Sequence, residues 1–512
     1  MAVSKVFSSE LDGIEAKLIE VETDINVGLH SFNIVGLADK ALSEAKERIG
    51  SALKNIGVKS PNKENRKIVV NLAPADLKKA GSHYDLAIAV GYLLATEQIK
   101  NFDGADKIFI GELSLEGKLR PIAGALNIAR LAKRIGKKEI FLPKENAVEA
   151  AIIPDLKVIP IPDLNSLIDH LEKREIISPQ PKTKVTDHRS LVAGNVDISE
   201  IKGQEHAKRA LMIAAAGGHN LLMVGPPGTG KTMLAQALNS ILPAPDLEEV
   251  VELTQIYSAA GVLADSPYVN WRPFRAPHHS ASPVSVIGGG QNPRPGEISL
   301  AHRGILFLDE LPEFRRDLLE ALRQPLESGR VTVARAKQVL TLPAKFVLVA
   351  AMNPCPCGYY GDSEKACRCG SFEISRYQKK ISGPLLDRID IQIEVPRVKI
   401  ERLVEKQIKD SGESGQIKEK IAEIRARQRT RFANHNIFTN SEMTSKLVDQ
   451  LTDLEKEAKD FAKEVFDRAH LSARGYYRVL KVARTIADLE TSEKVSAAHV
   501  AEAYNYRIKL LS

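Results

Sequence analysis

Cysteine and long hydrophobic runs are scarce in this sequence. Only four cysteines occur among 512 residues, and all of them lie between Cys355 and Cys369. No apolar run reaches the roughly eighteen residues that a membrane-spanning helix needs, and the N-terminal stretch MAVSKVFSSELDG has no apolar signal region. These absences argue against a transmembrane helix and a disulfide-rich scaffold, and they predict a cytoplasmic protein with no membrane partner.

The composition is that of a globular protein. Hydrophobic residues make up 43% of the chain and charged residues 27%, which is typical of soluble domains. The net charge of +7 is small for this length, so it permits binding to nucleic acid without requiring it. Local basic clusters must therefore decide that question.

Hydrophobic periodicity divides the chain into four segments. Residues 1–172 alternate strand-like runs with helical stretches, which predicts an N-terminal α/β domain. Residues 173–194 are rich in charge and proline, as is typical of a linker. Residues 195–397 again alternate apolar strands with helices, as in a parallel sheet covered by helices, and residues 398–512 are mainly helical. The predicted fold class is α/β with a helical C-terminal domain.

The strongest motif is a phosphate-binding loop in LLMVGPPGTGKTMLAQAL. An apolar strand runs directly into a glycine-rich turn, and a helix-forming run follows. The glycines let backbone N–H groups and the N-terminus of the next helix face phosphate oxygens. We expect Lys231 to reach the β- and γ-phosphates of a nucleotide and the Thr232 hydroxyl to bind Mg²⁺. The predicted binding residues are Gly225, Pro226, Pro227, Gly228, Thr229, Gly230, Lys231 and Thr232.

Acidic and amide side chains follow two further predicted strands. In GILFLDE, Asp309 is expected to hold Mg²⁺ and Glu310 to polarise an attacking water. The strand KFVLVAAMN places Asn353 at the same edge of the sheet, where its amide can orient that water. The paired histidines His278 and His279 precede these strands, and we expect a structural role for them.

Two arginines are candidates for stabilising charge on a transferring phosphoryl group. Arg388 lies just before another predicted strand in GPLLDRIDIQIEV, and Arg474 begins a helix in SARGYYRVL. Either arginine alone could form an ordinary surface salt bridge. Their order along the chain, after the phosphate loop and the acidic pair, favours the functional interpretation.

The ordered set GPPGTGKT, ILFLDE, AAMNPCPCG, GPLLDRID and SAR resembles the AAA+ ATPases, and more closely their magnesium-chelatase-like YifB/ComM branch. The resemblance covers nearly the whole chain and implies ATP and Mg²⁺ as ligands. It also implies that residues 398–512 form a helical lid, that Arg388 is an arginine finger acting on a neighbouring subunit, and that Arg474 is the second sensor. A site completed by a neighbour requires a ring, and in this family the ring is usually a homo-hexamer.

The resemblance further implies a DNA motor with helicase or branch-migration activity, which promotes integration of single-stranded DNA during natural transformation or recombination. Its partners would be single-stranded or branched DNA and recombination proteins. The alternatives are a magnesium-chelatase-type ATPase subunit and an ATPase that remodels protein complexes. The N-terminal domain argues against the chelatase, because the chelatase motor subunit does not normally carry such a domain.

Inserted hairpins in the ATPase core are the expected DNA contacts. RPFRAPHHSASPVSVIGGGQNPRPGEISLAHRG resembles the inserted hairpin of this branch, and SGRVTVARAKQVLTLP alternates as a second hairpin with Arg335 and Lys337 near its tip. Basic tips suit a phosphate backbone, although both residues could simply be solvated. A basic helical stretch, RARQRTR, could contact DNA or simply be exposed; its arginines are Arg425, Arg427, Arg429 and Arg431.

The N-terminal domain carries a second resemblance. GELSLEGKLRPIAGALNIARLAKRIGKKEIFLPKEN is similar to the proteolytic domain of Lon-type proteases, a ribosomal S5 domain 2-like fold that uses a serine and a lysine. Leu126 stands where the lysine would fall, and Ser82 has no evident lysine partner. Because an unactivated serine is a weak nucleophile, we expect the fold without the protease activity.

The cysteines form two C-x-C pairs, Cys355/Cys357 and Cys367/Cys369, directly after Asn353. Four thiolates joined by a short loop meet the tetrahedral requirement of structural Zn²⁺. The pairs are tighter than the usual C-x₂₋₄-C spacing, so free thiols or a redox pair remain alternatives. A closed four-sulfur site has no position for substrate, which favours a structural role.

Overall fold

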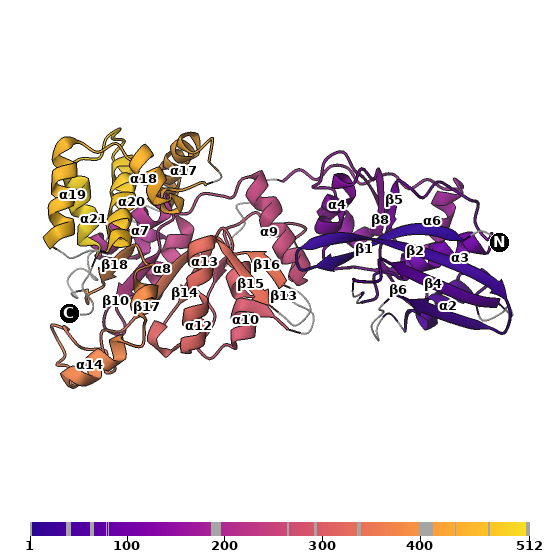
Figure 1. The fold of residues 1–512 in the computed structure, drawn as a ribbon, viewed down its shortest axis with the longest axis horizontal. Helices are drawn as coiled ribbons and strands as arrows, with labels where there is room; N and C mark the ends of the chain where they lie inside the picture. The colour runs from indigo at the N-terminus through magenta and orange to yellow at the C-terminus, as the bar shows by residue number, and fades with distance from the viewer. Residues whose placement is uncertain are drawn as a thin grey trace. The chain divides into compact units, whose positions relative to one another are not determined.

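The chain folds into two compact units, one made of Met1–Asp187 with Asp246–Asn270 and the other of His188–Pro245 with Trp271–Ser512 (Figure 1). Because Asp246–Asn270 belongs to the first unit, the chain passes between the units three times. The computed structural model describes residues 3–36, 42, 44–61, 66–77, 79, 81–185, 196–263, 266–290, 294–334, 339–398, 413–435, 437–468 and 472–507.

The first unit is built on a four-stranded sheet in the order β1-β2-β4-β3. The strands are β1 (Ser4–Asp12), β2 (Glu15–Val27), β3 (Ser31–Val35) and β4 (Arg66–Ala73). Buried and more exposed residues alternate along β2 and β4, as expected for a sheet with one face in the core. Helices α2 (Ala45–Asn55) and α3 (Asp85–Ala95) contribute apolar side chains to that core.

A second, parallel sheet completes this unit in the order β5-β8-β9. Its strands are β5 (Lys107–Phe109), β8 (Glu139–Pro143) and β9 (Lys157–Ile161). The accompanying elements are the strand pair β6 (Glu112–Leu113) with β7 (Leu119–Arg120), and the helices α4 (Ala125–Arg134), α5 (Ala147–Ala150) and α6 (Leu164–Leu171). The alternation of strands and helices predicted for this segment is therefore present. The specific Lon-like fold stays a prediction.

Helix α9 (Leu247–Ala260) packs with the first unit although it follows the phosphate loop in sequence. Arg130 of α4 donates to the Gln255 side chain of α9 at 2.6 Å, and the Ser258 hydroxyl donates to Glu149. Val250 of α9 joins the same apolar cluster as α4. Sequence periodicity placed this helix within residues 195–397, because periodicity shows that a helix has an apolar face but not which core receives it.

The second unit contains a five-stranded sheet in the order β11-β14-β17-β10-β18, and every pairing within it is parallel. Nearly every residue of β10, β14, β17 and β18 is buried, as expected for a sheet covered on both faces. The predicted parallel sheet is thus confirmed. Its strands are β10 (Leu221–Val224), β11 (Phe274–Arg275), β14 (Ile305–Leu308), β17 (Val347–Met352) and β18 (Ile391–Glu394).

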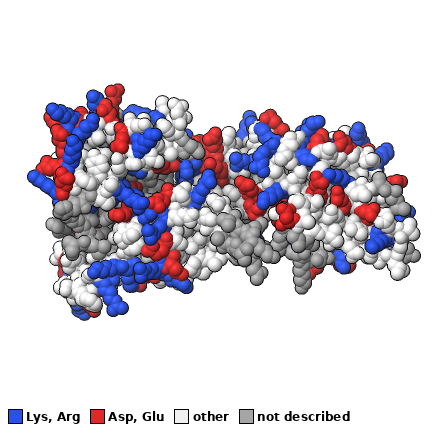
Figure 2. Space-filling view, in the orientation of Figure 1, with Lys and Arg blue, Asp and Glu red and all other residues white. Residues whose placement is uncertain are grey.

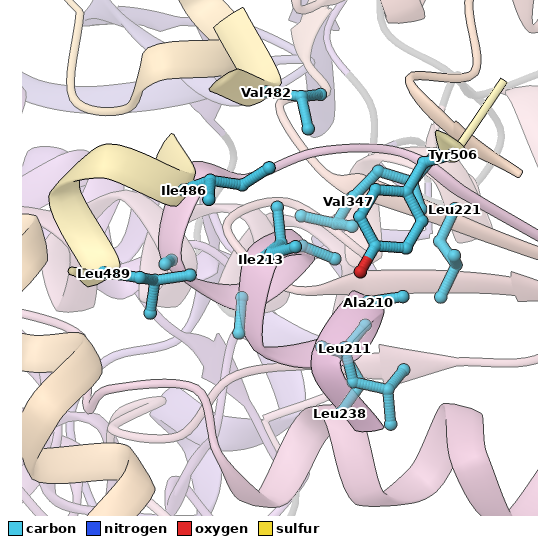
Figure 3. Close-up of a cluster of buried hydrophobic side chains, with 14 of the residues drawn as sticks. Ala210, Leu211, Ile213, Leu221, Leu238, Val347, Val482, Ile486, Leu489 and Tyr506 are labelled. Carbon is cyan, nitrogen blue, oxygen red and sulfur yellow. The ribbon is translucent and has the colours of Figure 1, made fainter. Parts of the chain in front are cut away.

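Apolar side chains from this sheet and from α7 (Glu205–Gly217), α8 (Lys231–Ser240) and α20 (Ala473–Leu489) meet in one buried cluster (Figure 3). Helix α7 has nine buried residues, and seven of them belong to this cluster, which is why its sequence EHAKRALMIAAAG is so rich in alanine. The described C-terminal residues are mainly helical, as predicted, and these helices appear orange to yellow in Figure 1. They are α17 (Glu413–Arg431), α18 (Ser445–Leu451), α19 (Lys456–Arg468), α20 (Ala473–Leu489) and α21 (Ala497–Asn505).

Shorter elements connect the sheet strands. Two antiparallel strand pairs interrupt this unit: β12 (Gly288–Gly289) with β13 (Arg294–Pro295), and β15 (Arg330–Ala334) with β16 (Val339–Pro343). The short helices are α8 (Lys231–Ser240), α10 (Pro283–Ile287), α11 (Glu297–Leu300), α12 (Arg316–Ala321), α13 (Arg323–Ser328), α14 (Ser371–Gln378) and α15 (Gly383–Leu386).

A buried carboxylate fastens the C-terminal helices to the sheet. Asp390 accepts hydrogen bonds from the backbone N–H of Asn220, at 3.2 Å, and from Arg478 of α20, and His219 lies 3.5 Å away. Burial would raise the pKa of Asp390, but the Arg478 guanidinium and the neighbouring His219 ring hold it well below its usual range. The start of β10 and the helix that carries Arg474 are therefore held by one ionised group.

None of the helices in the described part of the chain is both long enough and apolar enough to cross a membrane.

Candidate functional site

The predicted phosphate loop leaves the carboxyl end of β10 and leads into α8, which begins at Lys231. Lys231 Nζ donates to the carbonyl oxygens of Gly225 and Pro226, at 2.8 Å each. Thr229 Oγ1 donates to the Pro226 carbonyl at 3.0 Å. Burial lowers the pKa of Lys231, and the nearby Asp309 carboxylate opposes that shift. The lysine is therefore held inside the loop that is expected to surround the phosphates.

Three glycines of the loop have identifiable roles. A Cβ atom at Gly225 would lie 2.2 Å from the Val395 carbonyl oxygen, so only glycine allows the loop to pass the end of β18. Gly228 and Gly230 have left-handed φ angles of +77° and +84°, and a Cβ at either would meet no neighbour within 4 Å. The left-handed backbone conformation favours glycine at these two positions, and no atom of the described residues fills the space beside them. Both features fit a loop that wraps around phosphate.

Thr232 and Asp309 meet at the carboxyl edge of the sheet. Thr232 Oγ1 donates to Asp309 Oδ2 at 3.0 Å. Asp309 directly follows β14, whose neighbour β17 lies between it and β10, so the carboxyl ends of three parallel strands converge here. A hydroxyl and a carboxylate in contact at an exposed edge are the oxygen ligands that Mg²⁺ takes beside nucleotide phosphates. The two residues thus fit the predicted metal role.

Asn353 lies beside the lysine of the loop. β17 ends at Met352, and the parallel register pairs Met352 with Val224 of β10. The N–H of Gly225 donates to the Met352 carbonyl at 3.2 Å, and Lys231 Nζ lies 3.5 Å from Asn353 Oδ1. The structure therefore brings Asn353 to the phosphate loop, as the strand pattern predicted.

Glu310 has a partner that sequence reasoning missed. His279 Nδ1 lies 3.4 Å from Glu310 Oε2, and the His279 ring packs edge-on against Phe314. Glu310 has a left-handed φ of 52°, which turns its side chain away from the strand direction. The strand order could have suggested this pairing. His279 follows β11, which pairs in parallel with β14, so His279 and Glu310 both leave the same edge of the sheet. His279 can therefore orient the carboxylate predicted to act on water.

Arg376 of α14 and Lys380, which follows that helix, line a cavity that contains Glu310 and Asn353. The cavity has a volume of about 530 Å³. A group of Lys and Arg side chains lies over α14 at the lower left of Figure 2. The cavity is lined by Glu310, Glu313, Asn353, Pro356, Glu373, Arg376, Tyr377 and Lys380. The predicted water-activating residues thus face an open, charged space rather than the protein core.

Arg388 and Arg474, far apart in sequence, meet on one carboxylate. Arg388 Nη2 lies 2.8 Å from Glu327 Oε2, and Arg474 Nη2 lies 3.4 Å from Glu327 Oε1. Arg388 Nη1 also donates to the Pro384 carbonyl at 2.7 Å. Sequence reasoning named both arginines but missed Glu327, because nothing in its local pattern distinguishes it from other helical glutamates.

The sheet separates this arginine pair from the phosphate loop of the same chain. Leu221 pairs with Ile391 in the parallel register, so Arg388 lies before the amino end of β18 while Gly225 lies beyond the carboxyl end of β10. Four strand residues span about 13 Å, so the two sites occupy opposite edges of the sheet. Arg388 is thus placed to act on something other than its own phosphate loop.

The four cysteine sulfurs converge. Cys355 Sγ lies 3.4 Å from Cys357 Sγ and 3.7 Å from Cys367 Sγ. The sulfurs of Cys357 and Cys367 are 3.6 Å apart. All four sulfurs, including that of Cys369, lie within 4.8 Å of one another. Four Zn–S bonds of about 2.3 Å in a tetrahedron imply sulfur separations of about 3.8 Å. The cluster therefore fits a tetrahedral Zn²⁺ in size.

The cysteine loop contacts the phosphate loop. A Cβ at Gly358, which has φ of +85°, would lie 2.7 Å from Cδ of Pro227 and 3.9 Å from Cγ of Asn353. Gln378 of α14 donates to the Pro354 carbonyl at 3.0 Å, and Arg397, beyond β18, donates to Asp362 at 2.7 Å. The cysteine loop is thus fixed against the nucleotide side of the sheet.

The predicted DNA contacts have different outcomes. Arg335 and Lys337 lie outside the described residues, between β15 and β16. Arg425 donates two hydrogen bonds to the Ala215 carbonyl, and Arg431 pairs with the buried Asp488 at 2.6 Å. These two arginines of RARQRTR hold α17 against its neighbours, so the expectation of a DNA-binding or simply exposed residue is wrong for Arg425 and Arg431. Arg427 and Arg429 lie on the exposed side of the same helix.

Ser82 of the first unit is also engaged. Its hydroxyl donates to Glu112, while the side chain of the buried Lys79 donates to the Pro74 carbonyl. The absence of protease activity stays a prediction.

Replacing Gly358 with alanine is expected to weaken nucleotide binding. The new Cβ would press on Pro227, and the left-handed backbone would be strained, so affinity should fall about five- to tenfold. Gly361→Ala is the matched control, because Gly361 has φ of +78° but its Cβ would meet nothing within 4 Å. Equilibrium titration with a fluorescent nucleotide compares the two variants. Equal losses, or no loss in Gly358→Ala, would show that this contact does not shape the loop.

Comparison with known families covers most of the chain. Residues 197–403 match the model described as magnesium chelatase, subunit ChlI, residues 21–146 match subunit ChlI of Mg-chelatase, and residues 411–507 match the magnesium chelatase subunit ChlI C-terminal model. The 38 kDa magnesium-chelatase subunit of Rhodobacter capsulatus is 28% identical over 173 residues, which is 30% of this chain and 49% of that subunit.

Two relatives match over nearly their full length. Competence protein ComM of Haemophilus influenzae is 42% identical over 512 residues, covering 99% of this chain and 98% of the relative. Protein YifB of Escherichia coli is 42% identical over 510 residues, covering 99% and 97%. With the AAA+ site geometry above, these matches show that the chain belongs to the YifB/ComM family of magnesium-chelatase-like AAA+ proteins.

Proposed function

We propose that this protein is an ATP-dependent, homo-hexameric DNA motor that drives strand exchange by helicase or branch-migration activity. The observation that carries the proposal is the full-length match to competence protein ComM, combined with arginines that lie at the opposite sheet edge from the phosphate loop. A role in natural transformation or recombination follows from the same relative. A cytoplasmic location, where DNA and recombination proteins are available, belongs to the same proposal.

ATP would bind at the phosphate loop. Backbone N–H groups around Gly228 and Gly230 would donate to phosphate oxygens, and Lys231 would exchange its carbonyl partners for the β- and γ-phosphates. Thr232 and Asp309 would hold Mg²⁺, which supplies charge neutralisation to the phosphates when bound. The side chains that this role requires are already within hydrogen-bond distance of one another.

Hydrolysis needs a positioned water and a stabilised transition state. Glu310 would accept a proton from water, with His279 orienting its carboxylate, and Asn353 would orient that water from the end of β17. Arg388 would stabilise the developing phosphoryl charge on a neighbouring chain, and Arg474, which shares its partner Glu327, would contact the same nucleotide.

The arginine placement supports a ring. Within one chain, Arg388 contacts Glu327 and Pro384 and lies about 13 Å or more along the strands from the loop. A subunit that presents a phosphate loop at one edge and arginines at the other makes a head-to-tail contact, and such contacts form a ring when the rotation between neighbours closes. We propose the hexamer as the closed form.

DNA would be contacted by the β15–β16 hairpin. Its described strands pair from Arg330 with Pro343 to Ala334 with Val339, and the basic residues Arg335 and Lys337 lie between them in sequence. Cations at hairpin tips bind a phosphate backbone without reading its sequence, so binding should weaken with salt. Movement of the hairpins with the ATP state would shift the DNA.

The main rival is a magnesium-chelatase-type ATPase subunit, and remodelling of protein complexes is a further alternative. The chelatase subunit of Rhodobacter capsulatus covers 30% of this chain, whereas ComM and YifB cover 99%. Similarity over the whole chain, including the first unit, therefore favours the DNA motor.

We also propose that the cysteine cluster holds a structural Zn²⁺. The sulfur separations of 3.4 to 3.7 Å suit a tetrahedral ion, and four thiolates leave no open position for substrate.

A strand-displacement assay tests the motor. The protein should unwind a forked or three-stranded DNA only with ATP, and Lys231→Ala should lose unwinding at least about a hundredfold because no other cation replaces Lys231 at the phosphates. Lys456→Ala, an exposed lysine at the start of α19, is the control and should unwind normally. ATPase activity that ignores DNA, with no unwinding, would contradict the proposal.

Elemental analysis tests the zinc site. Protein purified without added metal should contain about one zinc per chain, and Cys357→Ser with Cys367→Ser should lose it because two sulfurs cannot complete a tetrahedral site. Less than about one zinc per two wild-type chains would favour free thiols or a redox pair.

A further inference from the structure

The arginine pair is held by a residue that no motif identifies. Glu327 lies near the end of α13 and is half-exposed, yet each of its carboxylate oxygens takes a different arginine. The hydrogen bond from Arg388 lowers the pKa of Glu327, so the carboxylate is ionised at neutral pH. One carboxylate thus pairs with both candidate phosphate-binding arginines within a single chain.

Arg388 depends on this partner. Its side chain is only 6% exposed, and its Nε is buried without a hydrogen-bond partner. A buried guanidinium needs a counter-charge, and Glu327 supplies it at 2.8 Å. A phosphate approaching from outside would have to compete with this carboxylate for the same N–H groups.

The pocket around Glu327 has more cationic than anionic side chains. A pocket of about 390 Å³ is lined by Glu327, Asp387, Arg388, Met443, Thr444, Ser445, Ala473, Arg474, Tyr477, Arg478 and Lys481. Four of these side chains are cationic and two are anionic. Of the cations, Arg478 is already paired with Asp390. If Glu327 moved away, the pocket would gain net positive charge at the arginines.

Glu327 is also joined to the base of the β15–β16 hairpin. Ser328 Oγ donates to the Gln324 carbonyl at 2.9 Å and accepts from the Arg330 N–H at 3.3 Å. The Gly329 N–H donates to the Pro325 carbonyl at 2.8 Å, and the Ala344 N–H donates to the Gly329 carbonyl at 2.8 Å. The end of α13 and both hairpin strands therefore form one hydrogen-bonded piece.

We propose that Glu327 is a positioning residue that couples the β15–β16 hairpin to Arg388 and Arg474. Its carboxylate holds both arginines inside the chain, and displacement of the hairpin base by bound DNA releases them to the triphosphate on a second copy of this chain. The proposal rests on the proposed DNA-dependent ATPase. It adds Glu327 as the residue that links DNA binding at the hairpin to the arginines that contact the nucleotide.

ATPase rates with and without single-stranded DNA test this coupling in the full-length protein. Glu327→Gln keeps the shape but removes the charge, so the DNA-free rate should rise about threefold or more while the DNA-stimulated rate changes less than about twofold. Glu327→Ala should behave in the same way. Glu320→Gln is the matched control, because Glu320 pairs with Arg323 at 2.6 Å rather than with the two arginines.

Adding Arg388→Ala to Glu327→Gln should return the DNA-free rate to that of Arg388→Ala alone, because the carboxylate acts through that arginine. An unchanged stimulation ratio in Glu327→Gln, or a lower rate in both conditions, would overturn the proposal. A wild-type rate that ignores DNA would instead contradict the DNA motor. In that case a raised rate in Glu327→Gln would still support restraint of the arginines, and an unchanged rate would overturn it.

Discussion

The hydrogen bonding of β10 between β17 and β18 is the constraint on which the ATP site depends. Val224 pairs with Met352 on one side and Glu394 on the other, so the chain that leaves β10 must pass between the ends of both neighbours. That passage explains why Gly225 has no room for a side chain and why Asn353 lies beside Lys231. A shift in this register would separate the loop from its amide partner.

The same sheet places the phosphate loop and Arg388 at opposite edges. Its carboxyl edge carries the phosphate loop, Asp309 and Asn353, and its amino edge carries Arg388. Asp390 binds the amino edge to α20, the helix that begins beside Arg474. The phosphate loop and the two arginines are thus fixed to one scaffold.

The cysteine loop adds a local support to the carboxyl edge. Gly358 packs on Pro227, and the loop begins immediately after Asn353, so a closed metal site there would limit the movement of both. A small metal-stabilised loop needs no core of its own, because metal binding contributes its folding free energy directly. The proposed metal site would explain why a chain with so little cysteine concentrates all of it at one position.

The sequence predicts where residues lie when their position depends on strand order, but not when it depends on packing between distant segments. The strands that precede Lys231, Asp309 and Asn353 were predicted because buried parallel strands and glycine-rich turns have local signatures. The pairing of His279 with Glu310 was missed because it joins neighbouring strands distant in sequence.

Packing between distant segments also accounts for the other differences between the structure and the predictions from sequence. α9 joins the first unit through side chains that periodicity cannot assign, and Arg425 and Arg431 turn inward because carbonyl and carboxylate partners on other helices receive them. Glu327 carries no motif at all, since its importance arises from two arginines that lie 61 and 147 positions further along the chain. The DNA-contact role of Arg335 and Lys337 stays a prediction.

Mixing two inactive variants tests the central claim that the arginine of one chain completes the ATP site of another. Lys231→Ala lacks a working phosphate loop and Arg388→Ala lacks the arginine, so each alone should hydrolyse little ATP. In an equal mixture, about a quarter of the subunit contacts in a ring would pair an intact loop with an intact arginine, and ATPase should return to about that fraction of the wild-type rate. A mixture as inactive as its separate components, or full activity in Arg388→Ala alone, would contradict this account.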